Sequence, residues 1–357
     1  MRQPSAFALV LVFVGGLLFA SSATAGRVPV LVSTDLATGL VNGSRAGPSD
    51  IDDGLAAVMA LHSRGLRVLG VVTTYGNNDV GPETVAARRI LHTLLGSKVP
   101  VVVGAAVKLS APQVQWFDRN EILSACVNDG VRFLARQLRH GPATVLALGP
   151  LTDIGCLIQN YPAVARKIKR VVAIMGRQPD QAFSINGHLG LTDFNFRLDP
   201  RAAGILLNQS RIPVTFMTFG MTSGTFIPSA RLAPLRNGGK LQRFFYRAVQ
   251  PWLAFWQDRF GENGFHPWDQ NAVYNAISPK ACNCDRLGYK IVQCGPAGGP
   301  SPCAGHGPSQ PPSLNGETAQ LWLDPSYKTR KMTAGVGYVS AAAKAKFQTA
   351  AVRLLGG

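Results

Sequence analysis

Short runs of β-branched and apolar residues alternate along this chain with amphipathic stretches. The apolar runs predict strands over Val28–Thr34, Arg67–Thr74, Val99–Gly104, Thr144–Leu148, Val171–Met175 and Pro213–Phe219. The stretches between them predict helices over Gly54–Arg64, Pro82–Leu95, Asp129–Arg139, the residues after Thr152, and Pro200–Asn208. A repeated strand–helix alternation implies right-handed crossovers, and therefore a parallel sheet that helices cover on both faces.

The C-terminal part of the chain follows a different pattern. Leu241 to Ala276 is mainly helical in pattern, and two or three strands follow, interrupted by a Cys/Gly/Pro-rich loop at about 281–315. A helix over Ala341–Leu355 closes the chain. Because no linker divides the sequence, we predict one large α/β domain over residues 26–357. Its sheet is expected to be open and mainly parallel, with helices on both faces, in a Rossmann-like arrangement.

The first 25 residues have the features of a cleaved signal peptide. Arg2 precedes an apolar run from Ala6 to Ala20, and Ala23 and Ala25 form the small-x-small pattern that predicts cleavage after Ala25. The run is shorter than the roughly 20 residues of a membrane-spanning helix, and glycines interrupt it. We therefore expect an exported protein, periplasmic or secreted, without a stable membrane anchor.

Composition and charge narrow the class of protein. Apolar residues make up 46% of the chain and charged residues 15%, which excludes a disordered chain. The 36 basic and 19 acidic residues give a net charge of +17, which would suit a polyanionic partner. The basic residues come singly or in pairs, however, without interleaved aromatic residues. This diffuse charge favours a basic surface over nucleic-acid binding.

The chain has six cysteines. Cys126 and Cys156 lie among apolar, helical neighbours, so we interpret them as buried thiols. The other four, in the Cys/Gly/Pro-rich loop, fit two disulfides in an oxidising compartment, and they are Cys282, Cys284, Cys294 and Cys303. A zinc site that uses His306 is the alternative, but the spacing matches no common zinc finger.

Polar residues gather where several predicted strands end. Asp35 follows the first strand, and three acids, in the sequence Asp50-Ile51-Asp52-Asp53, begin the next helix. Acids at a helix N-terminus interact favourably with the helix dipole, but so many close together repel one another unless a cation lies between them. Asp269 follows Trp268 at the start of another helix. Oxygen ligands without Cys or His indicate Ca²⁺ or Mg²⁺.

The sequence resembles the inosine-uridine nucleoside hydrolase family over essentially all of residues 26–357. The resemblance rests on short segments that occur in the order typical of the family. They are Ser33-Thr34-Asp35, Asp50-Ile51-Asp52-Asp53-Gly54-Leu55-Ala56, Val72-Thr73-Thr74-Tyr75-Gly76-Asn77, Leu148-Gly149-Pro150-Leu151-Thr152-Asp153, Ile174-Met175-Gly176, Asp193-Phe194-Asn195-Phe196-Arg197-Leu198-Asp199-Pro200 and Trp268-Asp269-Gln270-Asn271-Ala272-Val273.

This resemblance implies hydrolysis of the N-glycosidic bond of a ribonucleoside, with one bound calcium ion. The implied Ca²⁺ ligands are the carboxylates of Asp35, Asp53 and Asp269 and the backbone carbonyl of Thr152, and Asp35 is also implied to activate the attacking water. Asp52 and Asn195 are implied to hold the 2′- and 3′-hydroxyls of the sugar, and Asn186 and Asp193 its 5′-hydroxyl. Asn77 is implied to line the same pocket. The cleavage passes through an oxocarbenium-like state, which suits nearby negative charge and a firm grip on the ring hydroxyls.

Several positions depart from the family pattern. Ser33 replaces the first acid of the usual pair, and sixteen residues separate Asp35 from Asp52, more than in common members. Asp193 stands where glutamate is usual, and Trp268 stands where many members have a histidine. Trp268 resembles purine-preferring members, in which two tryptophans flank the base; Trp116 is our candidate for the second. Core packing is the alternative for Trp116.

Three other functions compete with this interpretation. An aspartyl-phosphate phosphatase also has an acid-rich strand end, but its nucleophilic aspartate is replaced here by Ser33. A non-catalytic periplasmic nucleoside or ribose-binding protein would use the same cleft without turnover. A polyanion-binding module would lose its affinity in salt. We expect a small-molecule nucleoside as substrate and no nucleic acid as partner; homo-oligomerisation stays open.

Overall fold

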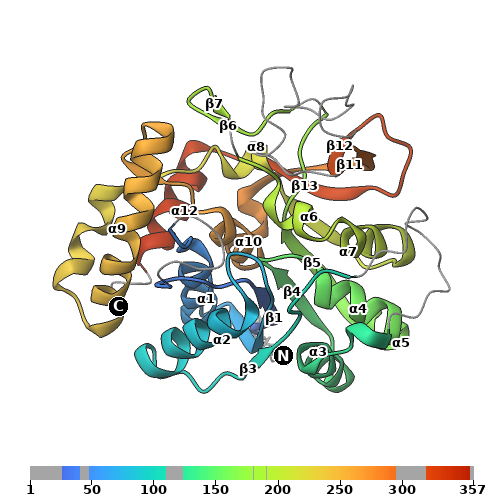
Figure 1. Cartoon of the computed structure of the whole chain (residues 1–357). Coiled ribbons are helices and arrows are strands. Elements are labelled where there is room, and N and C mark those ends of the chain that lie inside the picture. The colour runs from blue at the N-terminus through green and yellow to red at the C-terminus, as the bar shows by residue number, and fades with distance from the viewer. Residues whose placement is uncertain are drawn as a thin grey trace, which may run out of the picture.

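The computed structural model describes residues 26–40, 48–109, 124–179, 181–189, 191–294 and 319–353. Its centre is a sheet of nine strands in the order β12-β11-β13-β8-β5-β4-β1-β2-β3 (Figure 1). The strands are β1 (Val28–Thr34), β2 (Leu66–Thr73), β3 (Val101–Val103), β4 (Ala143–Ala147), β5 (Ile168–Ile174), β8 (Val214–Met217), β11 (Cys282–Gln293), β12 (Ala319–Asp324) and β13 (Met332–Tyr338).

Most neighbouring strands of this sheet are parallel. The strands β3, β2, β1, β4, β5, β8 and β13 are parallel to their neighbours in this order. Strand β11 runs antiparallel to both β13 and β12. In the middle of the sheet Val32 pairs with Val71 on one side and Leu146 on the other. Two further strand pairs lie outside the sheet, namely β6 (Ser184–Ile185) with β7 (His188–Leu189) and β9 (Ile227–Pro228) with β10 (Gly264–Phe265).

Helices cover both faces of the sheet. In Figure 1, α1 and α2 lie on one side of the central strands, and α3, α4 and α5 lie on the other. The helices are α1 (Asp52–His62), α2 (Val80–Arg88), α3 (Asp129–His140), α4 (Thr152–Asn160), α5 (Pro162–Ala165), α6 (Phe194–Leu198), α7 (Pro200–Gly204), α8 (Phe219–Thr222), α9 (Lys240–Phe260), α10 (Trp268–Ile277) and α12 (Ala341–Arg353).

Each face of the sheet packs its own hydrophobic core. Because successive side chains of a strand point to opposite faces, Val30 and Val32 join the core beneath α1 and α10, while Leu31 joins the core beneath α3 and α4. Helix α3 shows how the sequence builds this cover. Its N-cap Asn128 accepts a hydrogen bond from the Val131 backbone N–H, and a buried apolar stripe begins at Val131.

The structure confirms the predicted fold class, a single α/β domain with a mainly parallel sheet and helices on both faces. All six predicted strands match within three residues at each end, and β8 is three residues shorter than predicted. The predicted signal peptide, residues 1–25, lies outside the described residues. None of the described helices is long and apolar enough to cross a membrane.

The cysteines differ from the sequence-based interpretation. Cys126 and Cys156 form a disulfide with a Cα–Cα distance of 6.0 Å, so the interpretation of both as buried thiols is wrong. Cys126, three residues before α3, and Cys156, in the middle of α4, meet in space because these two helices pack side by side. Cys282 and Cys284 form a second disulfide within β11, and Cys294 is also disulfide-bonded. Cys303 and His306 lie outside the described residues.

Candidate active site

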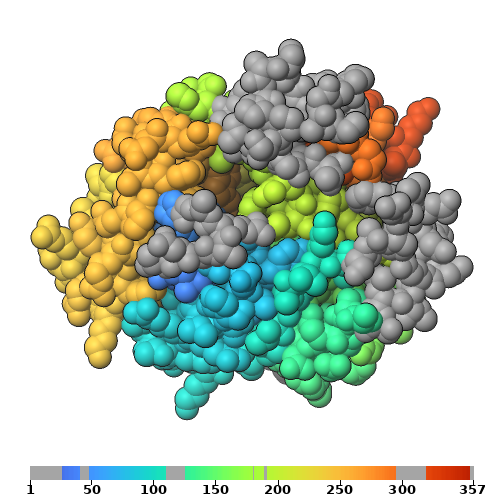
Figure 2. All heavy atoms as spheres, in the orientation of Figure 1, coloured from blue at the N-terminus to red at the C-terminus, as the bar shows by residue number. Residues whose placement is uncertain are grey.

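A cavity of about 420 Å³ lies beyond the carboxyl ends of the parallel strands. Residues that follow β1, β4, β5 and β8 line it, as expected for ligand sites of open parallel sheets. The cavity has the size of a small-molecule pocket. Figure 2 shows a hollow on this face of the molecule, between α9, in gold, and α6, in yellow-green.

Asp35, which directly follows β1, is a buried carboxylate of the cavity. Its Oδ2 accepts a hydrogen bond from the backbone N–H of Asn77 at 2.9 Å. Two glycines from neighbouring strand ends make room for it: a Cβ on Gly76 would lie 1.9 Å from Oδ2, and a Cβ on Gly149 would lie 2.7 Å from Oδ1. The Asn77 side chain donates to Asp53 Oδ2 at 3.0 Å and so joins the two acids.

Two helix N-termini bring further carboxylates to the same point. Asp52 and Asp53 begin α1, and Asp269 belongs to the first turn of α10. The Asp269 backbone N–H donates to Asp52 Oδ2 at 3.1 Å, so the two helix ends are joined directly. One carboxylate oxygen from each of Asp52, Asp53 and Asp269 lies within 4.8 Å of the other two. Thr34 donates a short hydrogen bond to Asp53.

The electrostatics of this cluster suit a cation. Burial, followed by repulsion from Asp52, Asp53, Asp35 and Asp50, raises the pKa of Asp269 well above its usual range. Burial likewise raises the pKa values of the other four carboxylates. Among the described residues, no lysine or arginine forms a salt bridge with any of the five. Buried, mutually repelling carboxylates of this kind are a ligand set for a hard cation such as Ca²⁺.

The neighbouring wall of the cavity is polar and comes from the residues after β4 and β5, from Asp193 and from the first turn of α6. Asn195 donates through Nδ2 to the backbone carbonyl of Leu148 at 2.6 Å. Its Oδ1 is then available to accept a hydrogen bond from another group. Asp193 accepts from the Gly176 backbone N–H at 2.7 Å and is buried. Leu148, Asp193 and Asn195 all line the cavity.

The opposite wall is aromatic. Trp268, Phe219 and Phe183 line the cavity and form a row: Trp268 stacks on Phe219 with centroids 5.9 Å apart, and Phe219 stacks on Phe183 at 3.9 Å. His266 stacks behind Trp268 at 5.0 Å, and burial lowers its pKa. None of the described residues that line the cavity is a histidine.

Most of the residues predicted from the sequence meet in this cavity. Those that line it are Asp35, Asp52, Asp53, Asn77, Asp193, Asn195, Trp268 and Asp269. Thr152 does not line it, because this residue begins α4 and its hydroxyl donates to buried Asp199 at 2.8 Å. The chain lines the cavity four positions before Thr152, at Leu148, which directly follows β4.

Two other predicted residues do not contribute to the described cavity. Asn186 does not line it; this exposed residue occupies the turn between β6 and β7, with φ 51°, and its side chain donates to the Phe260 carbonyl at 3.1 Å. Trp116 lies outside the described residues.

Several lining residues were not predicted from the sequence. Phe183 and Phe219 carried no signal, because an aromatic residue near a strand end is as typical of a core as of a binding site. Leu148 was overlooked because it would contribute through its backbone carbonyl. Every residue has this group, so the type of side chain gives no signal. Its position, directly after a predicted strand and before Gly149, could have indicated it.

Comparison with known proteins gives a consistent result. A sequence profile of the inosine-uridine preferring nucleoside hydrolase family matches residues 47–338. An uncharacterised protein of Schizosaccharomyces pombe is 28% identical over 260 residues, which are 67% of this chain and 81% of that protein. The pyrimidine-specific ribonucleoside hydrolase RihA of Shewanella oneidensis is 31% identical over 185 residues, which are 48% of this chain and 56% of that enzyme.

Solved structures of nucleoside hydrolases share the fold. The plant nucleoside hydrolase PpNRh1 has a TM-score of 0.69 at 17% identity, with 93% of this chain and 99% of that chain covered. The purine-preferring ribonucleoside hydrolase of Gardnerella vaginalis has a TM-score of 0.66 at 19% identity, with 92% and 99% covered. Sequence, fold and the carboxylate-lined cavity agree, and the chain belongs to the inosine-uridine preferring nucleoside hydrolase family, whose members hydrolyse the N-glycosidic bond of ribonucleosides.

Proposed function

We propose that this protein hydrolyses purine ribonucleosides to free base and ribose, with one Ca²⁺ in the carboxylate cluster and Asp35 as general base. The observation that carries the proposal is the shape of the cavity, in which buried carboxylates face one end of an aromatic wall. A ribose at the carboxylates would place its base along that wall.

The residues that would hold the cation are Asp35, Asp53, Asp269 and the carbonyl of Leu148. The oxygen-only donor set and the absence of neutralising basic side chains around the five carboxylates, among the described residues, support this assignment. When bound, Ca²⁺ would offset the repulsion within the cluster and lower the pKa of a coordinated water. The Leu148 carbonyl replaces that of Thr152 in the sequence-based ligand set.

Asp35 is suited to be the base because its geometry is fixed. One oxygen accepts from the Asn77 N–H, and the carboxylate packs closely against the backbone of Gly76 and Gly149, where no side chain displaces it. It would take a proton from the water as the water oxygen bonds to C1′ of the ribose. In the same step, and ahead of full bonding to the water, the C1′–N bond breaks and its electron pair leaves with the base.

The sugar would be held from two sides. Asp52, at the start of α1, and Asn195, with its free Oδ1, can accept from the 2′- and 3′-hydroxyls. Asp193, which is buried and lines the cavity, would accept from the 5′-hydroxyl. Acceptors around the ring increase its electron density, which stabilises the positive charge that develops in the oxocarbenium-like transition state.

The aromatic wall is the basis for the purine preference. Because no histidine lines the described cavity, the leaving base would be activated by stacking on Trp268 and by protonation from solvent. Purines have a basic N7 that can accept this proton, and pyrimidines have none. The Gardnerella structure is named purine-preferring and the Shewanella relative pyrimidine-specific, so the base preference needs its own measurement.

The test is a turnover assay with inosine, adenosine, guanosine, uridine and cytidine, following free base and reducing sugar with added Ca²⁺ or with chelator. We expect kcat/KM for purine nucleosides to exceed that for uridine by at least ~100-fold, equivalent to about 2.7 kcal/mol of barrier. Equal rates on inosine and uridine would refute the purine preference. Nucleoside binding without turnover would instead indicate a receptor.

A further inference from the structure

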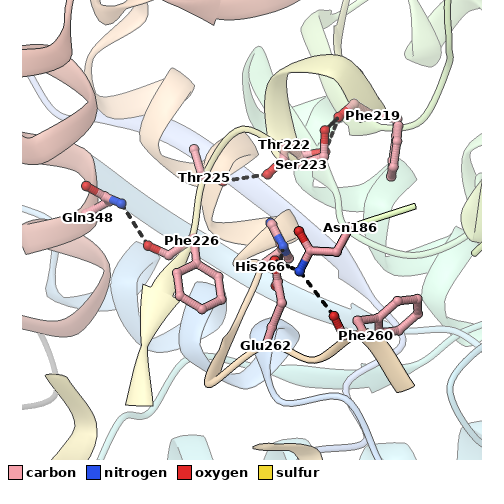
Figure 3. Close-up of polar contacts among 10 residues, drawn as sticks. All are labelled: Asn186, Phe219, Thr222, Ser223, Thr225, Phe226, Phe260, Glu262, His266 and Gln348. Atoms are coloured by element: carbon pink, nitrogen blue, oxygen red, sulfur yellow. Dashed lines mark hydrogen bonds and ion pairs between the residues drawn. The ribbon is translucent and has the colours of Figure 1, made fainter. Parts of the chain in front are cut away.

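The carboxylate of Glu262, two residues after α9, connects two separate parts of the active-site wall. Its Oε1 accepts a hydrogen bond from Asn186 Nδ2 at 3.3 Å, and its Oε2 pairs with His266 Nε2 at 2.8 Å. The pair with His266 is largely buried: 5% of the His266 side chain and 15% of the Glu262 side chain are exposed. Figure 3 shows Asn186, Glu262 and His266 together.

Asn186 forms the turn of the β6–β7 hairpin. Its left-handed backbone, with φ 51°, is one that asparagine tolerates better than most residues. The same side chain also donates to the carbonyl of Phe260, the last residue of α9, at 3.1 Å. Phe183, just before the hairpin, and Asp193, shortly after it, both line the cavity. Fastening the turn therefore restrains the sequence on both sides of it.

His266 lies behind the aromatic part of the wall, next to Trp268. Its ring stacks on Trp268 with an interplanar angle of 21° and packs against Trp256 at 5.1 Å and Phe226 at 5.5 Å. It does not line the cavity, so it would act on a substrate through Trp268, on which it stacks, and through Trp256, both of which do line it. The bond to Glu262 fixes the plane of the His266 ring, and this plane sets that of Trp268.

We propose that Glu262 is a positioning residue that holds the β6–β7 hairpin against the base-stacking wall, formed by Trp268, Phe219 and Phe183. It does so through its hydrogen bonds to Asn186 and His266, and we call this connection the latch. This inference rests on the proposed function, because it assumes that Trp268 contacts a nucleoside base. It replaces the role in 5′-hydroxyl binding that the resemblance implied for Asn186. Breaking the latch lowers the fraction of molecules whose site is organised before substrate binds, which raises KM in inverse proportion to that fraction.

Kinetics of latch variants on the best purine nucleoside test this proposal. Asn186→Ala and Glu262→Ala should each raise KM by about five- to tenfold, as expected for the loss of a hydrogen bond of ordinary net strength, with kcat within about twofold of wild type. The double variant should lose clearly less than the product of the two single losses, because both changes break the same connection and Asn186→Ala adds only the loss of the bond to Phe260. Glu262→Gln, which can accept from Asn186 and donate to His266, should restore most of the loss.

A substrate without the 5′-hydroxyl separates the latch from a direct sugar contact. If Asn186 is a latch, Asn186→Ala should lose the same factor on 5′-deoxyinosine as on inosine. A loss on inosine that disappears on 5′-deoxyinosine would overturn the proposal, and so would additive losses in the double variant or equal losses in Glu262→Gln and Glu262→Ala.

Amide hydrogen exchange gives a readout that does not need turnover. Glu262→Ala should speed exchange across residues 184–189, because the hairpin then opens more often. Asp258→Ala is the matched control, since Asp258 is an exposed acid of α9, and it should leave exchange there unchanged. Unchanged exchange in Glu262→Ala would overturn the latch. Absence of turnover in the wild-type protein would overturn only the proposed function.

Discussion

Gly76→Ala tests whether the position of the Asp35 carboxylate sets the rate of reaction. The new Cβ would lie 1.9 Å from Asp35 Oδ2 and 2.5 Å from its Cγ. Ordinary contacts of a Cβ begin above 3.0 Å, so the carboxylate or the backbone at residue 76 must move by about 1 Å. The hydrogen bond from the neighbouring Asn77 N–H to Asp35 would stretch or break with that movement.

Displacement of a catalytic group by about 1 Å typically costs about 10²-fold in rate, which corresponds to about 2.7 kcal/mol of activation free energy. We therefore expect Gly76→Ala to lower kcat on the preferred nucleoside by about two orders of magnitude. Overpacking should also lower the free energy of unfolding by about 1–3 kcal/mol. Thermal unfolding measured on the same sample shows whether the assayed protein is folded.

Gly81→Ala is the control for this experiment. Gly81 lies in the first turn of α2, and a Cβ there would meet no atom within 4 Å. The same chemical change, five residues away, should leave kcat unchanged. A folded Gly76→Ala protein with kcat within threefold of wild type would refute the idea that this glycine fixes the base.

Three further outcomes follow from the site. Asp35→Asn should lower kcat by about 10²–10⁴-fold with little change in ligand binding, because an amide cannot accept the proton; a loss below tenfold, measured by steady-state kinetics, would point to another base. Asp53→Ala and Asp269→Ala should each abolish both activity and bound calcium in elemental analysis, and wild-type calcium content in either variant would contradict the ligand assignment. Burial raises the pKa of Asp153 to about 6, so its contribution to folding is complete below about pH 4 and is lost as the pH rises through 6. Denaturant unfolding of wild type should therefore lose about 3 kcal/mol relative to Asp153→Asn between pH 4 and pH 7, and a pH-independent difference would refute this shift.

The fold was predictable where local pattern and topology agree. Strand β1 matches its prediction over Val28–Thr34, because a run of β-branched residues ending at an acid is a strong signal. Asp35, Asp53 and Asp269 converge as expected, because the ends of parallel strands and the helices after them face one edge of a sheet.

Features that depend on long-range geometry could not be predicted in this way. The Cys126–Cys156 disulfide joins residues 30 positions apart whose local surroundings are typical of buried thiols. Likewise, the turn at Asn186 directs its side chain toward Phe260, 74 positions away, and nothing near Asn186 in the sequence indicates that partner. In both cases tertiary packing determines the partner.

The hydrogen bond between Asp269 and Asp52 also has a consequence for how the molecule folds. It joins residues 217 positions apart, so one helix of the site comes from the start of the domain and the other from its last third. Contacts of such high sequence separation form slowly, because the chain must close a large loop before it gains any stabilising contact. We expect the N-terminal strands and α1 to become ordered well before α10 docks. Hydrolytic activity during refolding would therefore lag behind the recovery of secondary structure, and a chain truncated before α10 would have none.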